Sequence, residues 1–160
     1  MDTSFDRVSD GKDEWLTPKY ITDALGEFDL DPCAPMVRPW ETAKRYFTME
    51  DDGLIHKWEG RVWMNPPYGN QTCRWMKKLA DHDNGIALVF ARTETNTFFK
   101  WVWPYASSIT FLKGRLKFCH VDGLPANNSA GAPSCLISYG ENNAKILESI
   151  TISGKYIKLR

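Results

Sequence analysis

The stretch Val62-Trp63-Met64-Asn65-Pro66-Pro67-Tyr68 decides how this chain folds. A short apolar strand runs into two consecutive prolines, which have no N–H group and a fixed φ. The strand must therefore end, and the backbone carbonyls of Asn65 and Pro66 lose their ladder partners. Because open α/β sheets bind ligands at the carboxyl ends of their strands, this tetrapeptide lies where a binding site is expected.

The side chains of this tetrapeptide suit a planar group that carries an –NH2. The Asn65 oxygen and the Pro66 carbonyl can accept its two hydrogens, while the Tyr68 ring stacks on its face. The alternative interpretation is an ordinary turn, since Asn and Pro are common in turns. A second alternative makes Tyr68 a core ring.

Length and composition predict one folded domain over residues 15–160, preceded by a flexible arm over residues 1–14. Hydrophobic residues make up 42% of the chain and aromatic residues 13%, which argues against disorder. No run of 18 apolar residues occurs, so we expect no membrane partner. The polar N-terminus does not have the pattern of a signal peptide.

Metal-binding patterns are not found in the sequence. The cysteines form no Cys-x-x-Cys pair and the histidines have no metal-like spacing, so we expect no metal and read the cysteines as reduced and mostly packed. These residues are Cys33, Cys73, Cys119, Cys135, His56, His82 and His120.

Charge is unevenly distributed although the net charge is zero. Residues 1–60 hold twice as many acidic as basic side chains, and residues 61–160 hold about twice as many basic as acidic ones. This places the expected contact surface for a polyanion in the second part of the chain. Its densest segment, residues 92–117, contains Arg92, Lys100, Lys113, Arg115 and Lys117 against Glu94. The alternative is that both parts are solvated surfaces.

Hydrophobic periodicity predicts alternating strands and helices, and hence an α/β fold with a largely parallel sheet whose terminal strands could be antiparallel. Thr17 and Pro18 have the pattern of a helix N-cap and first helical residue. Residues 33–60 look irregular, with at most one short helix. Strands are expected at 28–31, 61–64, 85–90, 108–112, 116–121 and 134–139, and helices at 18–25, 72–80, 95–103 and 142–150.

Five segments, in this order, resemble the phage and prophage DNA N6-adenine methyltransferases, a Dam-like family. They are Trp15-Leu16-Thr17-Pro18, Asp29-Leu30-Asp31-Pro32-Cys33-Ala34, Asp52-Gly53-Leu54 with Trp58, Asn65-Pro66-Pro67-Tyr68-Gly69 and Gly114-Arg115-Leu116-Lys117-Phe118. The resemblance implies a compact class I, Rossmann-like methyltransferase sheet. The chain departs from the usual pattern in length: the 34 residues from Asp31 to Asn65 leave little room for further strand–helix units, so we expect a trimmed sheet.

The resemblance implies S-adenosylmethionine as cofactor. Thr17 and Pro18 would approach its methionine end, and Asp31 its amino group, with the backbone of Pro32 and Cys33 alongside. Asn65 would border both cofactor and substrate. Asp52 follows Asp31 by 21 residues, a spacing at which nucleotide-binding folds place an acid on the ribose. The alternatives are that Asp52 and Asp31 cap turns and that Thr17 caps a helix.

The implied reaction is methyl transfer to N6 of an adenine flipped out of DNA. Asn65, Pro66 and Tyr68 would be the catalytic residues, with Tyr68 stacking on the base beside Pro67. The remaining expected substrate contacts are phosphate contacts from Arg92, Lys113, Arg115 and Lys117. The turn after Asp31 contains no glycine, unlike the glycine-rich turn of larger methyltransferases, so close approach to the cofactor must arise differently.

Other readings remain open at this point. The chain could be a cofactor-free nucleic-acid-binding module on a degenerate methyltransferase fold, or act on RNA adenine, cytosine N4 or protein glutamine. A cysteine-dependent cytosine reaction is disfavoured because Pro32-Cys33 lies on the cofactor strand. We expect a cytoplasmic location, in the host cell if the chain is phage-encoded. The sequence defines neither the oligomeric state nor the recognition sequence.

Overall fold

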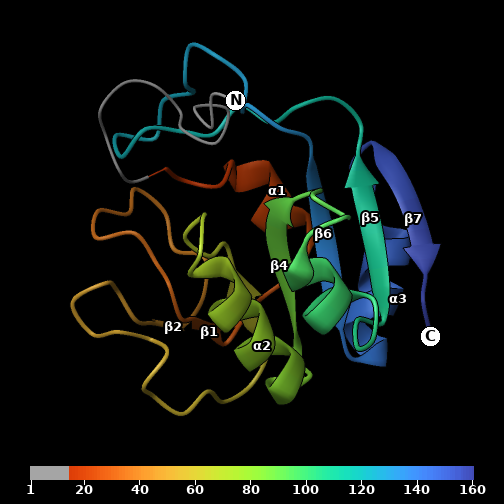
Figure 1. Ribbon diagram of the computed structural model, residues 1–160. Coiled ribbons are helices and arrows are strands. Elements are labelled where there is room, and N and C mark those ends of the chain that lie inside the picture. Colours follow the sequence, from red (N-terminus) through yellow and green to blue (C-terminus); the bar gives the residue numbers. More distant parts are fainter. Residues whose placement is uncertain (1–14) are drawn as a thin grey trace.

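A computed structural model describes residues 15–160, and the predicted arm over residues 1–14 lies outside them. The described chain forms a seven-stranded sheet in the order β2-β1-β3-β4-β6-β5-β7 (Figure 1). The strands are β1 (Leu30–Asp31), β2 (Arg45–Tyr46), β3 (Val62–Met64), β4 (Gly85–Phe90), β5 (Ser108–Leu112), β6 (Ser134–Tyr139) and β7 (Gly154–Lys158). The helices are α1 (Lys19–Ala24), α2 (Thr72–His82), the π-helix η2 (Phe98–Val102) and α3 (Glu141–Ser149).

The α/β class is confirmed, and the two strands that run against the others, β6 and β7, are the terminal strands that the sequence left open to be antiparallel. Strands β2, β1, β3 and β4 are parallel neighbours. Strand β6 is antiparallel to both β4 and β5, and β7 is antiparallel to β5. The reason lies in the connection from β5 to β6, which contains no crossover helix, and parallel neighbours usually require one.

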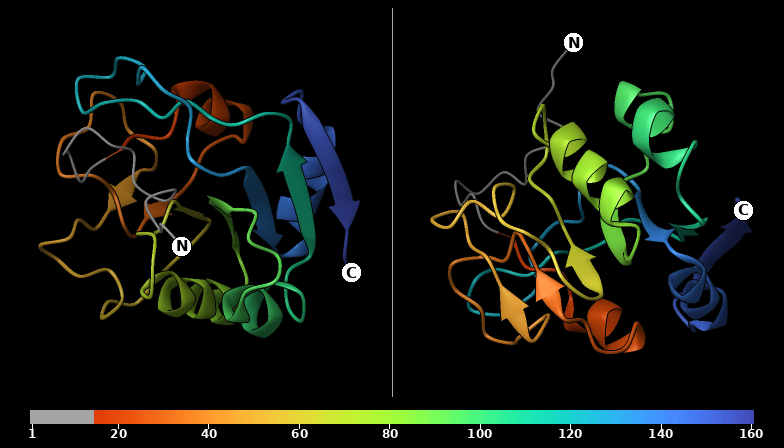
Figure 2. Two further views of the ribbon diagram at one scale, coloured as in Figure 1. Left: turned by 45° about the horizontal axis from the view of Figure 1, so that its top comes forward. Right: turned by 90° about the horizontal axis from the view of Figure 1, so that it is seen from below.

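Helices cover both faces of the sheet because β4 is apolar on both sides. Ile86, Leu88 and Phe90 pack on one face, in the cluster that holds residues of α1 and α3. Ala87 and Val89 pack on the other face, against residues of α2 and η2. This period of two is that of a strand buried on both sides. Figure 2 shows the resulting layers, with α2 beside η2 on one face and α1 and α3 on the other.

The order in which the chain adds strands to the sheet reverses its direction at β1. From β1 the chain adds β2 on one side, and it then returns to add β3 on the other side of β1. In open α/β sheets such a switch point creates a crevice outside the carboxyl ends of the two strands. Asp31 ends β1 and Asn65 directly follows β3, so two predicted site residues flank the switch point.

Local departures from the predicted elements are few. Helix α1 begins at Lys19, and Pro18 stands before it with an extended ψ of 134° and no side-chain cap, so Thr17 is not the helix cap that the sequence predicts. No strand forms over 116–121, where the ladder contacts with the rest of residues 15–160 are isolated bridges at Cys119. Within the described chain, 33–60 contains the short strand β2 and no helix, and 95–103 contains a π-helix. Strand β7 was not expected.

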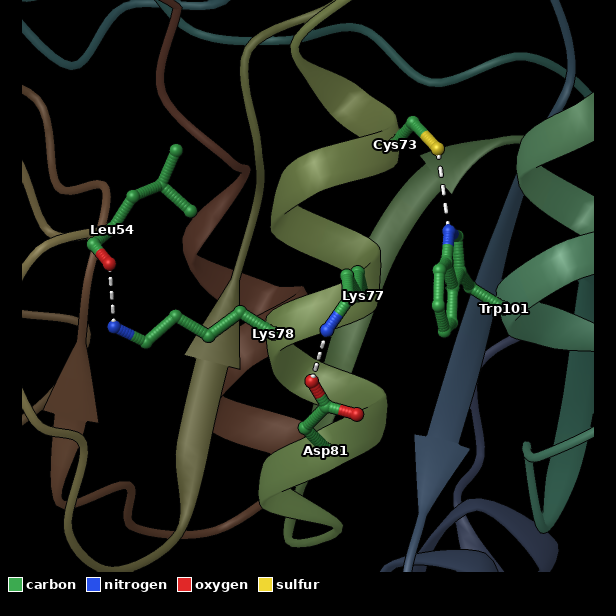
Figure 3. A network of polar contacts seen from close by, with 6 residues as sticks. All are labelled: Leu54, Cys73, Lys77, Lys78, Asp81 and Trp101. Carbon is green, nitrogen blue, oxygen red and sulfur yellow. Dashed lines mark hydrogen bonds and ion pairs between the residues drawn. The ribbon is translucent and has the colours of Figure 1, made fainter.

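Side chains of α2 hold the neighbouring segments in place (Figure 3). The Lys78 ammonium donates to the carbonyl of Leu54 at 2.7 Å and also to that of His56. On the other side of the helix, the Trp101 indole donates to the Cys73 sulfur at 3.3 Å. These contacts fix both the loop over residues 51–58 and helix η2 against α2.

Candidate active site

Asn65 meets residues from two other segments at the switch point. Its side-chain Nδ2 donates to the Thr17 hydroxyl at 3.1 Å, and its backbone carbonyl accepts from the Cys33 thiol at 3.3 Å. Its Oδ1 is buried and accepts no hydrogen bond from the residues that the structure describes. A buried amide oxygen without a donor is uncommon, because the desolvated acceptor costs about 1–3 kcal/mol. This oxygen is therefore suited to a donor brought by a ligand.

The Pro-Pro turn places an aromatic ring three residues after Asn65, against the end of β4. The ring of Tyr68 stacks on that of Phe90, the last residue of β4, with centroids 4.3 Å apart and planes 8° apart. Tyr68 is partly exposed, so it is not a fully buried core residue. Pro66 is buried, and the carbonyl of the exposed Pro67 accepts from the Thr72 hydroxyl at 2.7 Å, which ties the turn to the start of α2.

Asp31 is a buried carboxylate at the end of β1, 3% exposed. Its two oxygens accept from the Thr42 hydroxyl and, at 3.2 Å, from the Cys33 backbone N–H. Burial raises the pKa of Asp31 to about 6, while the hydrogen bonds from Thr42 and Cys33 and the positive charge of Arg38 oppose that rise. Burial also raises the pKa of the Cys33 thiol, so Cys33 is a neutral donor and not a nucleophile.

The segment around Asp52 packs against the end of β1. Asp52 itself is exposed with φ of 52°, and its carboxylate accepts from the Leu54 N–H at 3.2 Å, so it caps its own turn. The next residue, Gly53, is buried so close to β1 that a Cβ there would lie 1.9 Å from the Pro32 carbonyl oxygen. Close approach at this edge therefore comes from Gly53, although the turn after Asp31 contains no glycine.

The predicted phosphate-binding residues follow strands β4 and β5 and lie on the same edge of the sheet. Arg92 follows β4, with its guanidinium carbon 5.9 Å from the Phe90 ring centroid. Strand β5 is parallel to β4, so Lys113, Arg115 and Lys117 emerge at the carboxyl edge too. All three are exposed. Figure 1 shows the following segment running over the top of the sheet near α1.

A comparison with protein-family models decides the family. The model of the DNA N-6-adenine-methyltransferase (Dam) family matches residues 6–156, nearly the whole chain. The protein belongs to this Dam family. Comparisons with curated proteins and with solved structures found no match. Within residues 15–160, no helix has the length and apolar character that a membrane crossing needs, and no group of three or more His, Cys, Asp or Glu side chains could hold a metal ion.

Three residues at this candidate site were not predicted from the sequence to belong to it. Phe90 supports Tyr68, Thr42 binds Asp31, and Gly53 packs on Pro32. Phe90 could have been found as the last residue of the predicted strand 85–90, since strand ends line the site. Thr42 lies in an irregular stretch, and nothing in the sequence pattern marks it.

The raised pKa of Asp31 predicts a pH-dependent stability. Between the ordinary pKa of 3.8 and about 6, the unfolded chain has lost the Asp31 proton while the folded chain retains it. Folding stability is therefore expected to fall as the pH rises through this window, by about 3 kcal/mol, and to change no further through this group above it. Urea unfolding at pH 4 to 7 measures this, and Asp31→Asn should flatten the slope. An unchanged slope in that variant would assign the effect to other groups.

The contact of Gly53 with Pro32 predicts that Gly53→Ala damages the site. The added methyl group must displace the Pro32 carbonyl, which we expect to cost about 1–3 kcal/mol of stability and to weaken cofactor binding. Denaturant unfolding and calorimetric titration with S-adenosylmethionine measure the two effects. The control is Gly114→Ala, where φ is 72° but a Cβ meets no atom within 4 Å. Equal losses of cofactor affinity in both variants would contradict the steric explanation.

Proposed function

We propose that this protein transfers a methyl group from S-adenosylmethionine to N6 of an adenine flipped out of DNA. The observation that carries the proposal is the buried Asn65 Oδ1, which has no donor among the described residues and follows the strand at the switch point. An exocyclic amine is a donor of the right kind, and Dam-family membership makes adenine in DNA the substrate to propose.

The site residues fit the cofactor by their chemistry. Asp31, ionised above a pKa of about 6, would accept from the cofactor's ammonium group, with the backbone of Pro32 and Cys33 beside it. Thr17 and Pro18, both buried next to Asn65, would border the methionine end. The Asp52 carboxylate, whose Oδ1 accepts from the Leu54 N–H, would contact the ribose with its other oxygen. When bound, S-adenosylmethionine supplies an electrophilic methyl group on a sulfonium. A trimmed class I sheet is the fold that we propose for this arrangement.

Asn65 and Pro66 would act on the nucleophile. Adenine N6 is a weak nucleophile because its lone pair is delocalised into the ring. Acceptors that hold its two hydrogens out of the ring plane favour the more tetrahedral nitrogen of the transition state. As the new N–C bond forms, the S–CH3 bond would break and leave a neutral thioether. The nitrogen would then carry the positive charge and release one hydrogen as a proton to solvent. Tyr68 would keep the base aligned by stacking, with its own ring supported by Phe90.

The basic side chains around Gly114 would bind the DNA backbone. We predict that Arg115→Gln together with Lys117→Gln weakens DNA binding and lowers the slope of log affinity against log salt by about 2, because each substitution removes one phosphate-binding charge. Titrations at several salt concentrations measure the slope. The control replaces the exposed Lys155 and Lys158 of β7 in the same way and is expected to keep the slope. A slope equal in both double variants would contradict this DNA contact.

The reaction is tested by incubating the protein with cofactor and DNA from a methylation-free host. The digested DNA is then analysed by mass spectrometry for each methylated base. N6-methyladenine is the expected product. If N4-methylcytosine is the only methylated base found, the substrate is cytosine and not adenine. If RNA incubated in the same way becomes methylated and DNA does not, the substrate is RNA. Absence of cofactor binding at millimolar concentration would favour a nucleic-acid-binding module without catalysis.

A further inference from the structure

The orientation of the Asn65 amide depends on a residue 48 positions earlier in the chain. An amide can present either its oxygen or its NH2 group to a substrate, and only the oxygen can accept a hydrogen from an amine. Here Nδ2 is occupied by the Thr17 hydroxyl at 3.1 Å, and Oδ1 is the atom left without a donor among residues 15–160. When Asn65 Nδ2 bonds to Thr17, the Asn65 Oδ1 is therefore the atom that can accept a hydrogen from a substrate amine.

Thr17 is held firmly on both sides. Its neighbour Leu16 exchanges two backbone hydrogen bonds with Cys119, at 2.8 and 2.9 Å. On its other side Pro18 leads into α1, where the Ile21 N–H bonds to the Pro18 carbonyl at 3.0 Å. Thr17 itself is 5% exposed. The hydroxyl group therefore has a fixed place from which it can orient another side chain.

A hydroxyl group can donate as well as accept, so it selects one amide orientation only when its single hydrogen is used elsewhere. No described residue accepts the hydrogen of the Thr17 hydroxyl. If an acceptor took that hydrogen, the oxygen of Thr17 could only accept from Asn65, and the amide could not turn over. An anionic group of the cofactor's methionine end is an acceptor of this kind.

We propose that Thr17 is a positioning residue whose hydroxyl group holds the Asn65 amide with its oxygen toward the substrate amine, and that cofactor binding strengthens this hold. The inference rests on the function proposed above. It adds a role for Thr17 that differs from contact with the cofactor alone. Cofactor and substrate sites are coupled through one hydroxyl group, so Asn65 is fully oriented only when a methyl donor is present.

The first test uses no catalysis. Nuclear magnetic resonance measures the solvent exchange of the Asn65 side-chain NH2 protons, assigned by their loss in Asn65→Asp, with and without S-adenosylmethionine. We expect the cofactor to slow this exchange at least about tenfold in the wild-type protein and in Thr17→Ser, and not in Thr17→Val. Equal slowing in Thr17→Val would overturn the proposal, because that variant keeps the shape of the side chain without its hydroxyl group.

The second test measures single-turnover methylation of DNA at cofactor concentrations that saturate each variant. Thr17→Val is expected to react about 10- to 100-fold more slowly, and Thr17→Ser to recover most of the rate. The matched control is Thr110→Val in β5, where the threonine is 2% exposed and its hydroxyl has no partner among the described residues. Its rate should stay unchanged, and its melting temperature should not fall, because the substitution removes a buried hydroxyl group that has no partner.

The two tests separate the possible failures. A Thr17→Val rate equal to that of the wild type overturns the positioning role. A wild-type protein that methylates nothing overturns the proposed function, and the exchange measurement still decides whether Thr17 orients Asn65. A rate loss in Thr17→Val that disappears at saturating cofactor would reduce Thr17 to a cofactor contact and would also overturn the proposal.

Discussion

Asn65→Ala is expected to lower the rate of methyl transfer by about 100- to 1,000-fold, because it removes the acceptor that favours the tetrahedral amine. The affinity for S-adenosylmethionine should change little, since Asp31 and the backbone beside it remain. Single-turnover kinetics and calorimetry measure the two quantities. Removal of the hydrogen bond to Thr17 contributes to the effect, and the Thr17→Val variant measures that share.

Asn142→Ala is the matched control for this variant. Asn142 is exposed on α3, which covers the sheet away from the switch point, so its replacement should leave both rate and affinity unchanged. An Asn65→Ala protein that retained most of its turnover would contradict the role of Asn65. A protein that lost cofactor binding as well would place Asn65 mainly at the cofactor.

Tyr68→Ala is expected to reduce the binding free energy of the flipped base by about 1–3 kcal/mol, which is the contribution of one aromatic stacking contact. This corresponds to about a 5- to 150-fold rise in the DNA concentration needed for half-maximal rate. The variant also uncovers Phe90, so some stability is lost with it. The fluorescence of 2-aminopurine, placed at a site that the wild-type protein methylates, measures the unstacking of the base directly.

Tyr68→Phe keeps the ring and its stacking on Phe90, so it should retain most of the base binding. Comparison of the two variants at a temperature where both are folded separates the effect of stacking from that of stability. If Tyr68→Phe were as impaired as Tyr68→Ala, the hydroxyl group and not the ring would hold the base.

The strands of the central sheet could be predicted because 85–90 is apolar without interruption and the other two stretches are mostly apolar or β-branched. The stretches 85–90, 108–112 and 134–139 were predicted with the bounds that the structure has. Their direction was not predictable, since a strand buried on both faces looks alike in either direction. The stretch 116–121 has the alternation of a strand because Leu116 and Phe118 are buried beside the exposed Lys117. There the alternation reflects anchoring of an irregular segment and not ladder pairing.

The candidate site was predicted in part for a similar reason. The two prolines fix where β3 ends, so Asn65 could be placed at a strand end from the sequence alone. The hydrogen-bond partners of Asn65 could not be predicted from the sequence. Thr17 and Cys33 lie 48 and 32 positions away from Asn65, and only the fold brings them together. The close packing of Gly53 on Pro32 is likewise a long-range contact for which a single sequence gives no pattern.

The segment between β5 and β6 has a consequence for how this protein can change during evolution. It joins two adjacent antiparallel strands, which a turn of a few residues can join, yet it spans residues 113–133. Most of its length is therefore not needed to build the sheet. New side chains can be exchanged at the exposed positions of this segment, outside the buried Leu116, Phe118 and Cys119, while the strand order, Asp31 and Asn65 stay as they are, so this exposed surface can diversify independently of the chemistry.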